Sequence, residues 1–193
     1  MATPLPEIAS TLAAQLVAEL QRRGGHDAAA LVPMDGYHLD NAELDALGQR
    51  HEKGAPHTFD AAGFAGLVRA VRTQMDALRY PLFDRVQDKT LPDAGQLSPD
   101  VPIVVFEGNY LLLQRPHWSD LRDLFDLTVM LSVPMEVLRD RLVARWLAHG
   151  LPNDQAVIRA ESNDIPNAQL VIANSAPADM TIGSVSLAET QER

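Results

Sequence analysis

The sequence predicts a single α/β domain in which helices cover both faces of a mainly parallel sheet, giving three layers. Three observations indicate this class. Short apolar runs alternate with longer amphipathic segments, glycine and proline separate them, and two of the runs end at an acid followed by glycine, Asp35-Gly36 and Glu107-Gly108. Nearly continuous apolar runs are typical of strands buried on both faces, and their alternation with helices favours parallel order.

The first half of the chain predicts a helix over 7–23, a buried strand over 28–34 and a short helix over 41–47. A longer helix is predicted over 61–78, because apolar residues recur there at helical spacing and Asp60 is suited to its N-cap. The alternation of types begins with these elements, and the strand delivers Asp35 to its carboxyl end.

The second half begins with a polar segment over 80–100, which indicates a surface excursion or a short hairpin. Buried strands are predicted over 101–106 and 125–133, and helices over 117–124, 134–149 and 153–163. Two further short strands are expected over 169–174 and 179–182. We therefore expect one domain over 1–183 and a frayed tail over 184–193.

Composition narrows the possible partners. The 193 residues carry a net charge of −10 without a basic cluster, which argues against nucleic acid. No apolar run approaches the roughly 20 residues that span a bilayer, and the N-terminus lacks the pattern of a secretory signal. The absence of cysteine fits a cytoplasmic protein. We expect a small-molecule partner and no membrane, and leave a homodimer open.

Two acids, Asp35 and Glu107, each follow a predicted buried strand. The carboxyl ends of parallel strands meet at one edge of a sheet, which is where open α/β sheets bind ligands. Such a pair can hold magnesium and take a proton from an attacking hydroxyl. The alternative is that each acid caps the turn at its own glycine.

Polar groups elsewhere have structural alternatives too. Asp60 can cap a helix or face a substrate hydroxyl, and the segment Tyr80–Arg85 can clamp a small polar molecule or form a packed turn with an ion pair. Arg141 and Arg145 share a helical face and could neutralise a phosphoryl group, or form a solvated face with Arg139. A transition-metal site is a further alternative, but the histidines that would form it lack tight ligand spacing: His38, His51 and His57.

Several stretches together resemble the uridine kinase, phosphoribulokinase and bacterial pantothenate kinase group of P-loop kinases, and more closely bacterial kinases associated with fructose transport. The resemblance runs from about Ser10 to Ile182. It rests on residues 33–41, 53–60, 80–85, 107–112, 141–150, 163–164 and 167–168.

The resemblance implies transfer from ATP to a hydroxyl of a sugar, nucleoside or pantothenate-like compound, with Mg²⁺. It assigns Asp35 as the general base, and Arg141 and Arg145 to a lid over about 139–152. The implied acceptor side comprises Tyr37, His38, Asp60, Tyr80, Asp84, Arg85, Asn109 and Tyr110. The implied nucleotide side comprises Ser10, Thr11, Asn174 and Asp179, and the implied magnesium ligands are Ser10, Asp35 and Glu107.

The sequence departs from this group at the phosphate-binding loop GxxxxGK[ST]. The family's Gly-Lys would fall on Ile8-Ala9, and Ser10 alone matches, as the magnesium-binding hydroxyl. We expect the usual first central strand to be missing too, which exposes both neighbouring strands unless they pair directly.

Either the reading is truncated or the loop is lost, and in both cases we expect weak or no kinase activity from the chain as written. The alternatives are a non-catalytic binding or regulatory module and a metal-dependent nucleotide hydrolase.

Overall fold

The structure, a computed structural model, describes residues 5–73 and 75–183. This range contains helices and short strands. The helices are α1 (Leu5–Gly24), α2 (Asn41–Leu47), α3 (Ala61–Val71), α4 (Met135–Ala148), α5 (Asn153–Arg159) and α6 (Ile165–Asn174). The strands are β1 (Ala30–Pro33), β2 (Leu78–Asp84), β3 (Lys89–Leu97), β4 (Val104–Glu107), β5 (Val129–Ser132) and β6 (Met180–Gly183).

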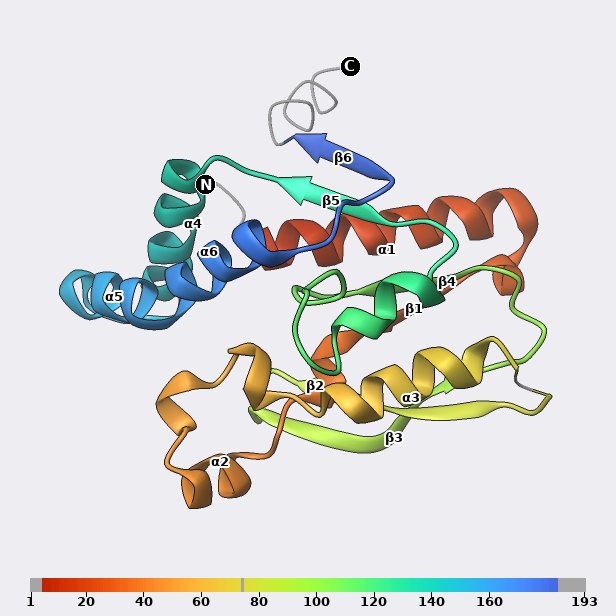
Figure 1. Cartoon of the computed structure of the whole chain (residues 1–193), viewed down its shortest axis with the longest axis horizontal. Helices are drawn as coiled ribbons and strands as arrows, with labels where there is room; N and C mark the ends of the chain where they lie inside the picture. Colours follow the sequence, from red (N-terminus) through yellow and green to blue (C-terminus); the bar gives the residue numbers. More distant parts are fainter. Residues whose placement is uncertain (1–4, 74, 184–193) are drawn as a thin grey trace.

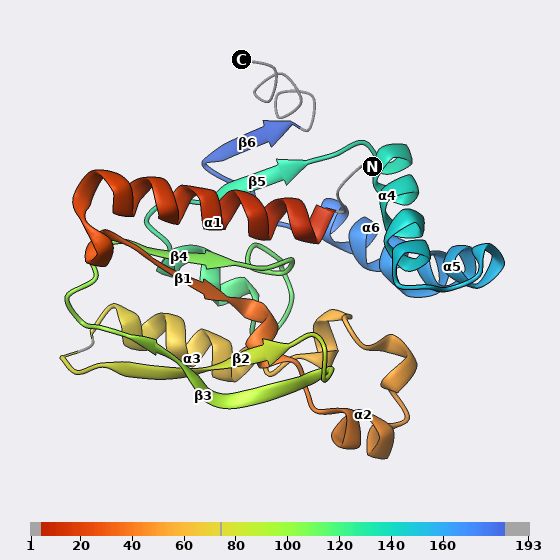
Figure 2. The ribbon, with the colours of Figure 1, turned by 180° about the vertical axis from the view of Figure 1, so that it is seen from behind.

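The strands form three separate pairs. β1 and β4 are parallel, from Ala30 opposite Val104 to Pro33 opposite Glu107. β5 and β6 are also parallel, whereas β2 and β3 form an antiparallel hairpin. Figures 1 and 2 show α1 running beside both parallel pairs. The predicted α/β class with parallel pairing is confirmed, and the segment over 80–100 is part of the hairpin.

Within the residues that the structure describes, β4 and β5 do not pair with each other. The sequence predicts a missing central strand whose two neighbours are exposed unless they pair directly, and these are two parallel strands that stay in separate pairs. Direct pairing between these two strands, one of the ways to close such a gap, is therefore not used. Helix α1 packs against both strands of the β1–β4 pair.

The main core lies between β1, α3 and the hairpin. It is built from side chains such as Val32, Phe64, Leu97, Leu113 and Trp118, each at most 2% exposed. The predicted apolar face of α3 is confirmed at Phe64, Leu67 and Val68. The helix ends at Val71, however, so the prediction of a helix to 78 is wrong. Met75, expected on its apolar face, is 88% exposed, because the chain there is turning toward β2.

A second correction concerns residues 169–174, which were expected to form a strand. They belong to α6, and α5 continues into α6 through a π-helical turn over Ala160–Asp164. A short apolar run does not distinguish a strand from a buried helix segment, and here Leu170 and Val171 pack against the main core from a helix. Among the described residues, no helix is long and apolar enough to cross a membrane. The predicted frayed tail lies outside the described residues.

Candidate functional site: the carboxylate edge

Asp35 and Glu107 lie at the same edge of the β1–β4 pair. Pro33 is directly opposite Glu107, and Asp35 follows two residues later on a tight 3₁₀ turn over Met34–Tyr37. Glycines fix the geometry. A Cβ at Gly36 would overlap the main-chain carbonyl of Pro81, and a Cβ at Gly108 would lie 2.5 Å from the Met34 Cβ. Both turns therefore need glycine to bring strand ends and hairpin together.

Each acid has a polar partner among the described residues. The Ser10 hydroxyl of α1 donates to Glu107 Oε1 at 2.8 Å, and Arg85 Nη2 lies 2.9 Å from Asp35 Oδ2. The Asp35 side chain is still 29% exposed and so can reach a ligand. We call Ser10, Asp35 and Glu107 the carboxylate edge.

The electrostatics of the edge favour a cation. Burial raises the pKa of Glu107, and the nearby negative charge of Asp35 adds to this, while the hydrogen bond from Ser10 opposes it. One hydroxyl and two carboxylates are the hard oxygen donors that Mg²⁺ prefers, so the residues fit this ion chemically.

The transition-metal alternative gains nothing from the structure. Residues 5–73 and 75–183 contain no group of three or more His, Cys, Asp or Glu arranged to hold a metal. His57 hydrogen-bonds Glu52 at 2.8 Å, while His38 stacks on Phe59 with ring centroids 4.0 Å apart. The histidines are thus engaged separately.

His38 and Tyr37, expected on the acceptor side, are largely buried. Burial lowers the pKa of His38 to about 4, so the imidazole is neutral at pH 7. Its Nδ1 is buried without a hydrogen-bond partner, and its ring also contacts Phe83 at 4.8 Å. Tyr37 packs edge-on against Phe64, and burial raises its pKa to about 12. Neither side chain is therefore charged near neutral pH.

A polar network beside His38 was not assigned from the sequence. Lys53 Nζ lies 2.8 Å from Asp88 Oδ1 and donates to Asn41 Oδ1 at 2.7 Å. Its ammonium also lies 5.0 Å from the centre of the Phe83 ring. The Lys53 side chain is only 12% exposed, so this network fixes the loop before α3 to the hairpin. The sequence does not mark this network, because the partners of Lys53 are distant from it along the chain.

Four of the expected acceptor residues have contacts that stabilise the fold. Asp60 Oδ1 accepts from Gly63 N at 2.8 Å and caps α3. Asp84 accepts from the amides of the hairpin turn, so Arg85 pairs with Asp35 instead of Asp84. The hydroxyls of Tyr80 and Tyr110 donate to main-chain carbonyls. Asn109, in contrast, is exposed directly after β4.

The two arginines expected in the lid differ. Arg141 Nε and Nη1 are buried and find no hydrogen-bond partner. Arg145 stacks over Trp146, with 5.0 Å between the guanidinium carbon and the ring centre. The solvated-face alternative holds for Arg139, which pairs with Glu161. Since a buried guanidinium without a partner is costly, Arg141 is the residue on α4 best suited to receive an anion.

The expected nucleotide side is more dispersed. Thr11 is exposed on α1, next to Ser10. The Asn174 side chain donates to Leu170 O at the end of α6. Asp179 accepts from both the amide and the hydroxyl of Thr128, and these bonds lower its pKa. Asn174 and Asp179 are thus engaged in holding α6 and β6.

The phosphate loop is absent from the sequence itself. The lysines of the chain, Lys53 and Lys89, follow Glu52 and Asp88, so the chain contains no Gly-Lys dipeptide. The residues present therefore fit magnesium but do not supply the usual cradle for nucleotide phosphates.

The parallel α/β fold, with an alcohol and two carboxylates at the strand ends, is that of the P-loop kinase class. No family model matches the sequence. The chain is 36% identical over 185 residues to the "putative uridine kinase" of Schizosaccharomyces pombe, covering 92% of this chain and 79% of that protein. It is 30% identical over 138 residues to the pantothenate kinase of Mycobacterium sp. (strain KMS), covering 72% of this chain and 44% of that enzyme.

Among solved structures, the "putative fructose transport system kinase" of Silicibacter sp. TM1040 is 44% identical, with a TM-score of 0.86. The match covers 93% of this chain and 85% of that one. The chain therefore belongs to the uridine kinase-like family of P-loop kinases.

Proposed function

We propose that the carboxylate edge binds a hydroxylated small molecule together with Mg²⁺, as the acceptor-activating part of an ATP-dependent phosphotransferase. The observation that carries this proposal is the shared edge, where Ser10, Asp35 and Glu107 gather at the ends of β1 and β4. Relatives named as uridine and pantothenate kinases support it, since both named substrates carry hydroxyl groups.

In this proposal Asp35 accepts the proton of the acceptor hydroxyl, and its ion pair with Arg85 orients the carboxylate. Ser10 and Glu107 would hold a magnesium ion, and the ion would supply positive charge to neutralise the phosphates. Arg141 supplies a cation, two of whose buried nitrogens have no hydrogen-bond partner among the described residues. Because the chain lacks the Gly-Lys dipeptide, we expect turnover by this polypeptide to be weak or absent.

Thermal stability tests the binding half of the proposal. Candidate sugars, nucleosides and pantothenate would be titrated with Mg²⁺, with and without ATP, against wild type, Asp35→Asn and Asp100→Asn. Asp100 is an exposed acid and serves as the matched control. We expect an acceptor to raise the Tm of wild type and Asp100→Asn, and to lose at least tenfold in affinity for Asp35→Asn. Equal binding by all three proteins would refute the assignment of Asp35.

A second candidate function is a non-catalytic module that binds the acceptor only. Stabilisation by an acceptor without any response to ATP would support this module. Turnover that Asp35→Asn abolishes would support the kinase. Release of phosphate from ATP without an acceptor would instead indicate a metal-dependent hydrolase.

A further inference from the structure

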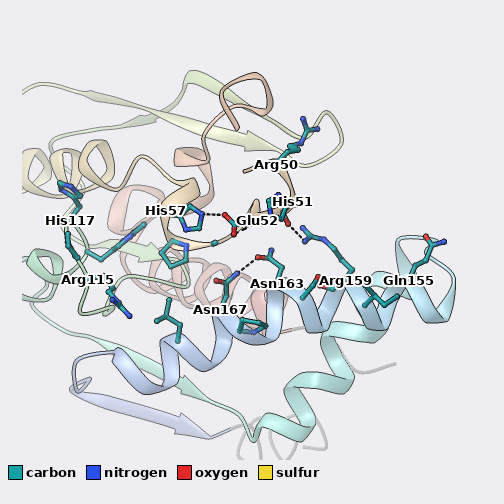
Figure 3. A pocket seen from close by; sticks show the side chains of 18 of the residues that line it. Arg50, His51, Glu52, His57, Arg115, His117, Gln155, Arg159, Asn163 and Asn167 are labelled. Carbon is teal, nitrogen blue, oxygen red and sulfur yellow. Dashed lines mark hydrogen bonds and ion pairs between the residues drawn. The ribbon is translucent and has the colours of Figure 1, made fainter. Parts of the chain in front are cut away.

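A large cavity of the described structure lies away from the carboxylate edge. It has a volume of about 1070 Å³ and lies between the loop before α3, the segment after Leu113, and helices α5 and α6. Figure 3 shows side chains from all of these segments around it. We call it the side cavity. Its volume is at the upper end of the usual range for small-molecule sites.

The side cavity is positively charged in a protein of net charge −10. Glu52 is the only acidic side chain among its lining residues. Its lining cations and titratable bases are Arg50, His51, His57, Arg115, His117 and Arg159. A local excess of this sign in an acidic chain favours anions over cations as ligands.

Some of these basic side chains already have a hydrogen-bond or ion-pair partner in the protein, and others do not. Arg50 pairs with Asp45 at 3.0 Å, and His57 pairs with Glu52 at 2.8 Å. Arg159 donates to the main-chain oxygen of His51 at 2.9 Å. Among the described residues, the side chains of Arg115 and His117 make no hydrogen bond or ion pair, so their donors are available. His117 also has a φ of 68°, a conformation that costs energy in a non-glycine residue.

The rest of the lining suits an organic group. Ile158, Pro166 and Leu170 give the cavity apolar surface, and Ile158 is 64% exposed. The amides of Asn163 and Asn167 lie between Arg115 and Arg159, as Figure 3 shows. A cavity with apolar walls and cations at its margin fits a molecule that has a flat or apolar body and an anionic end.

The side cavity is distinct from the carboxylate edge. None of Ser10, Asp35 and Glu107 lines it. The main chain at Lys53 and Gly54 is tied in place near the cavity, because Asn163 Nδ2 donates to Lys53 O at 3.0 Å and the Tyr110 hydroxyl donates to Gly54 O. Asn163 lines the cavity on one side of this main chain. The Lys53 ammonium instead contacts Asp88 in the polar network beside His38.

We propose that the side cavity is a second ligand site, for a small organic anion such as a phosphate monoester. Arg115 binds the anionic group, and the apolar surface at Pro166 and Leu170 receives the organic part. This site goes beyond the proposed function, because it needs neither Asp35 nor a nucleotide. A charged hydrogen bond from Arg115 would contribute about tenfold or more to the affinity.

Phenyl phosphate is a suitable probe, and benzyl alcohol is its uncharged counterpart. Binding would be measured by calorimetry and Tm for wild type, Arg115→Gln and Ser162→Trp. Ser162 is an exposed lining residue, so a tryptophan there blocks the cavity without entering the core. Arg79→Gln is the matched control, because Arg79 is an exposed arginine on β2 outside the cavity.

We expect phenyl phosphate to bind wild type and Arg79→Gln equally. We expect a loss of about tenfold for Arg115→Gln, no binding to Ser162→Trp, and much weaker binding of benzyl alcohol to wild type. Unchanged binding by Arg115→Gln and Ser162→Trp would overturn the proposal, as would the absence of binding to wild type at millimolar probe. Loss of binding in Asp35→Asn would also overturn it, by moving the probe to the carboxylate edge.

Discussion

The two parallel strand pairs are alike in length and direction but differ in what holds them. In β1–β4, Val32 is fully buried and the pair is part of the main core. In β5–β6, Val129 is 45% exposed and Met180 is 52% exposed. The second pair is instead tied at its start by hydrogen bonds that the amide and hydroxyl of Thr128 donate to the Asp179 carboxylate. The candidate chemistry is therefore placed on the pair with the firmer packing, which keeps Asp35 and Glu107 in position.

The largest expected effect is the loss of stability when alanine replaces a glycine beside β1, compared with the same replacement in β6. Gly36→Ala should destabilise the protein by about 3 kcal/mol or more, because its Cβ would overlap the main chain of the hairpin at Pro81. Gly183→Ala in β6 is the matched control, since its Cβ would meet nothing within 4 Å, and should stay within about 1 kcal/mol of wild type. Urea unfolding measures both. Similar losses would contradict the difference between the two pairs.

Next in size is the pH dependence that His38 imposes on the region beside β1. Its folded pKa of about 4 lies below the unfolded value of 6.5. As pH falls from 6.5 toward 4, the unfolded state therefore binds a proton that the folded state does not, and stability declines by an amount on the order of 3 kcal/mol. The charged groups that act on His38 are Asp35, Lys53, Asp88 and Arg85.

His38→Phe should flatten this decline, because phenylalanine can occupy the space between Phe59 and Phe83 without titrating. Urea unfolding of both proteins at a series of pH values between 7 and 4 measures the effect. An identical slope for wild type and variant would show that His38 is not the titrating group.

A smaller gain in stability is expected from Glu107→Gln. Because burial and Asp35 raise the pKa of Glu107, its charged form is disfavoured in the folded state, and a neutral amide relieves about 1 kcal/mol. The same change should abolish stabilisation by Mg²⁺ if Glu107 is a ligand. Tm measured with and without Mg²⁺ checks both outcomes. A lower Tm in the absence of metal would argue against this account of the edge.

The smallest global effect is expected from Asp179→Asn, which acts on β5–β6 alone. Amide hydrogen exchange in β5 and β6 should become faster while exchange in β1 and β4 is unchanged. In wild type the pKa of Asp179 is lowered by Thr128 and Arg122, so the same local protection should be lost as pH falls below the usual range of an aspartate. Equal acceleration in both pairs would mean that they open together.

The sequence was informative where a local pattern determines the structure. Asp35 and Glu107 were predicted at one edge because each follows a buried run, and Asp60 was recognised as a helix cap from its position before an apolar periodicity. The error at 169–174 arose because four apolar residues in a row fit either a strand or a helix that packs against the core.

Contacts between distant segments were not predictable in this way. The pair Arg85–Asp35 joins residues 50 apart, and Lys53 reaches Asp88 across 35 positions. The side cavity combines three segments whose residues have no common spacing. The unpaired buried atoms of Arg141 depend on the packing of α4 and have no signature in the sequence.

The π-helical turn over Ala160–Asp164 has a mechanical consequence. Its first residue, Ala160, packs with Leu138 and Leu142 of α4, whereas Leu170 and Val171 further along α6 pack against the main core. The wider turn changes which way the following side chains face, so one continuous helical segment contacts two different hydrophobic clusters. A movement of α4 and α5 would be taken up at this turn, beside Asn163, whose amide holds the main chain at Lys53.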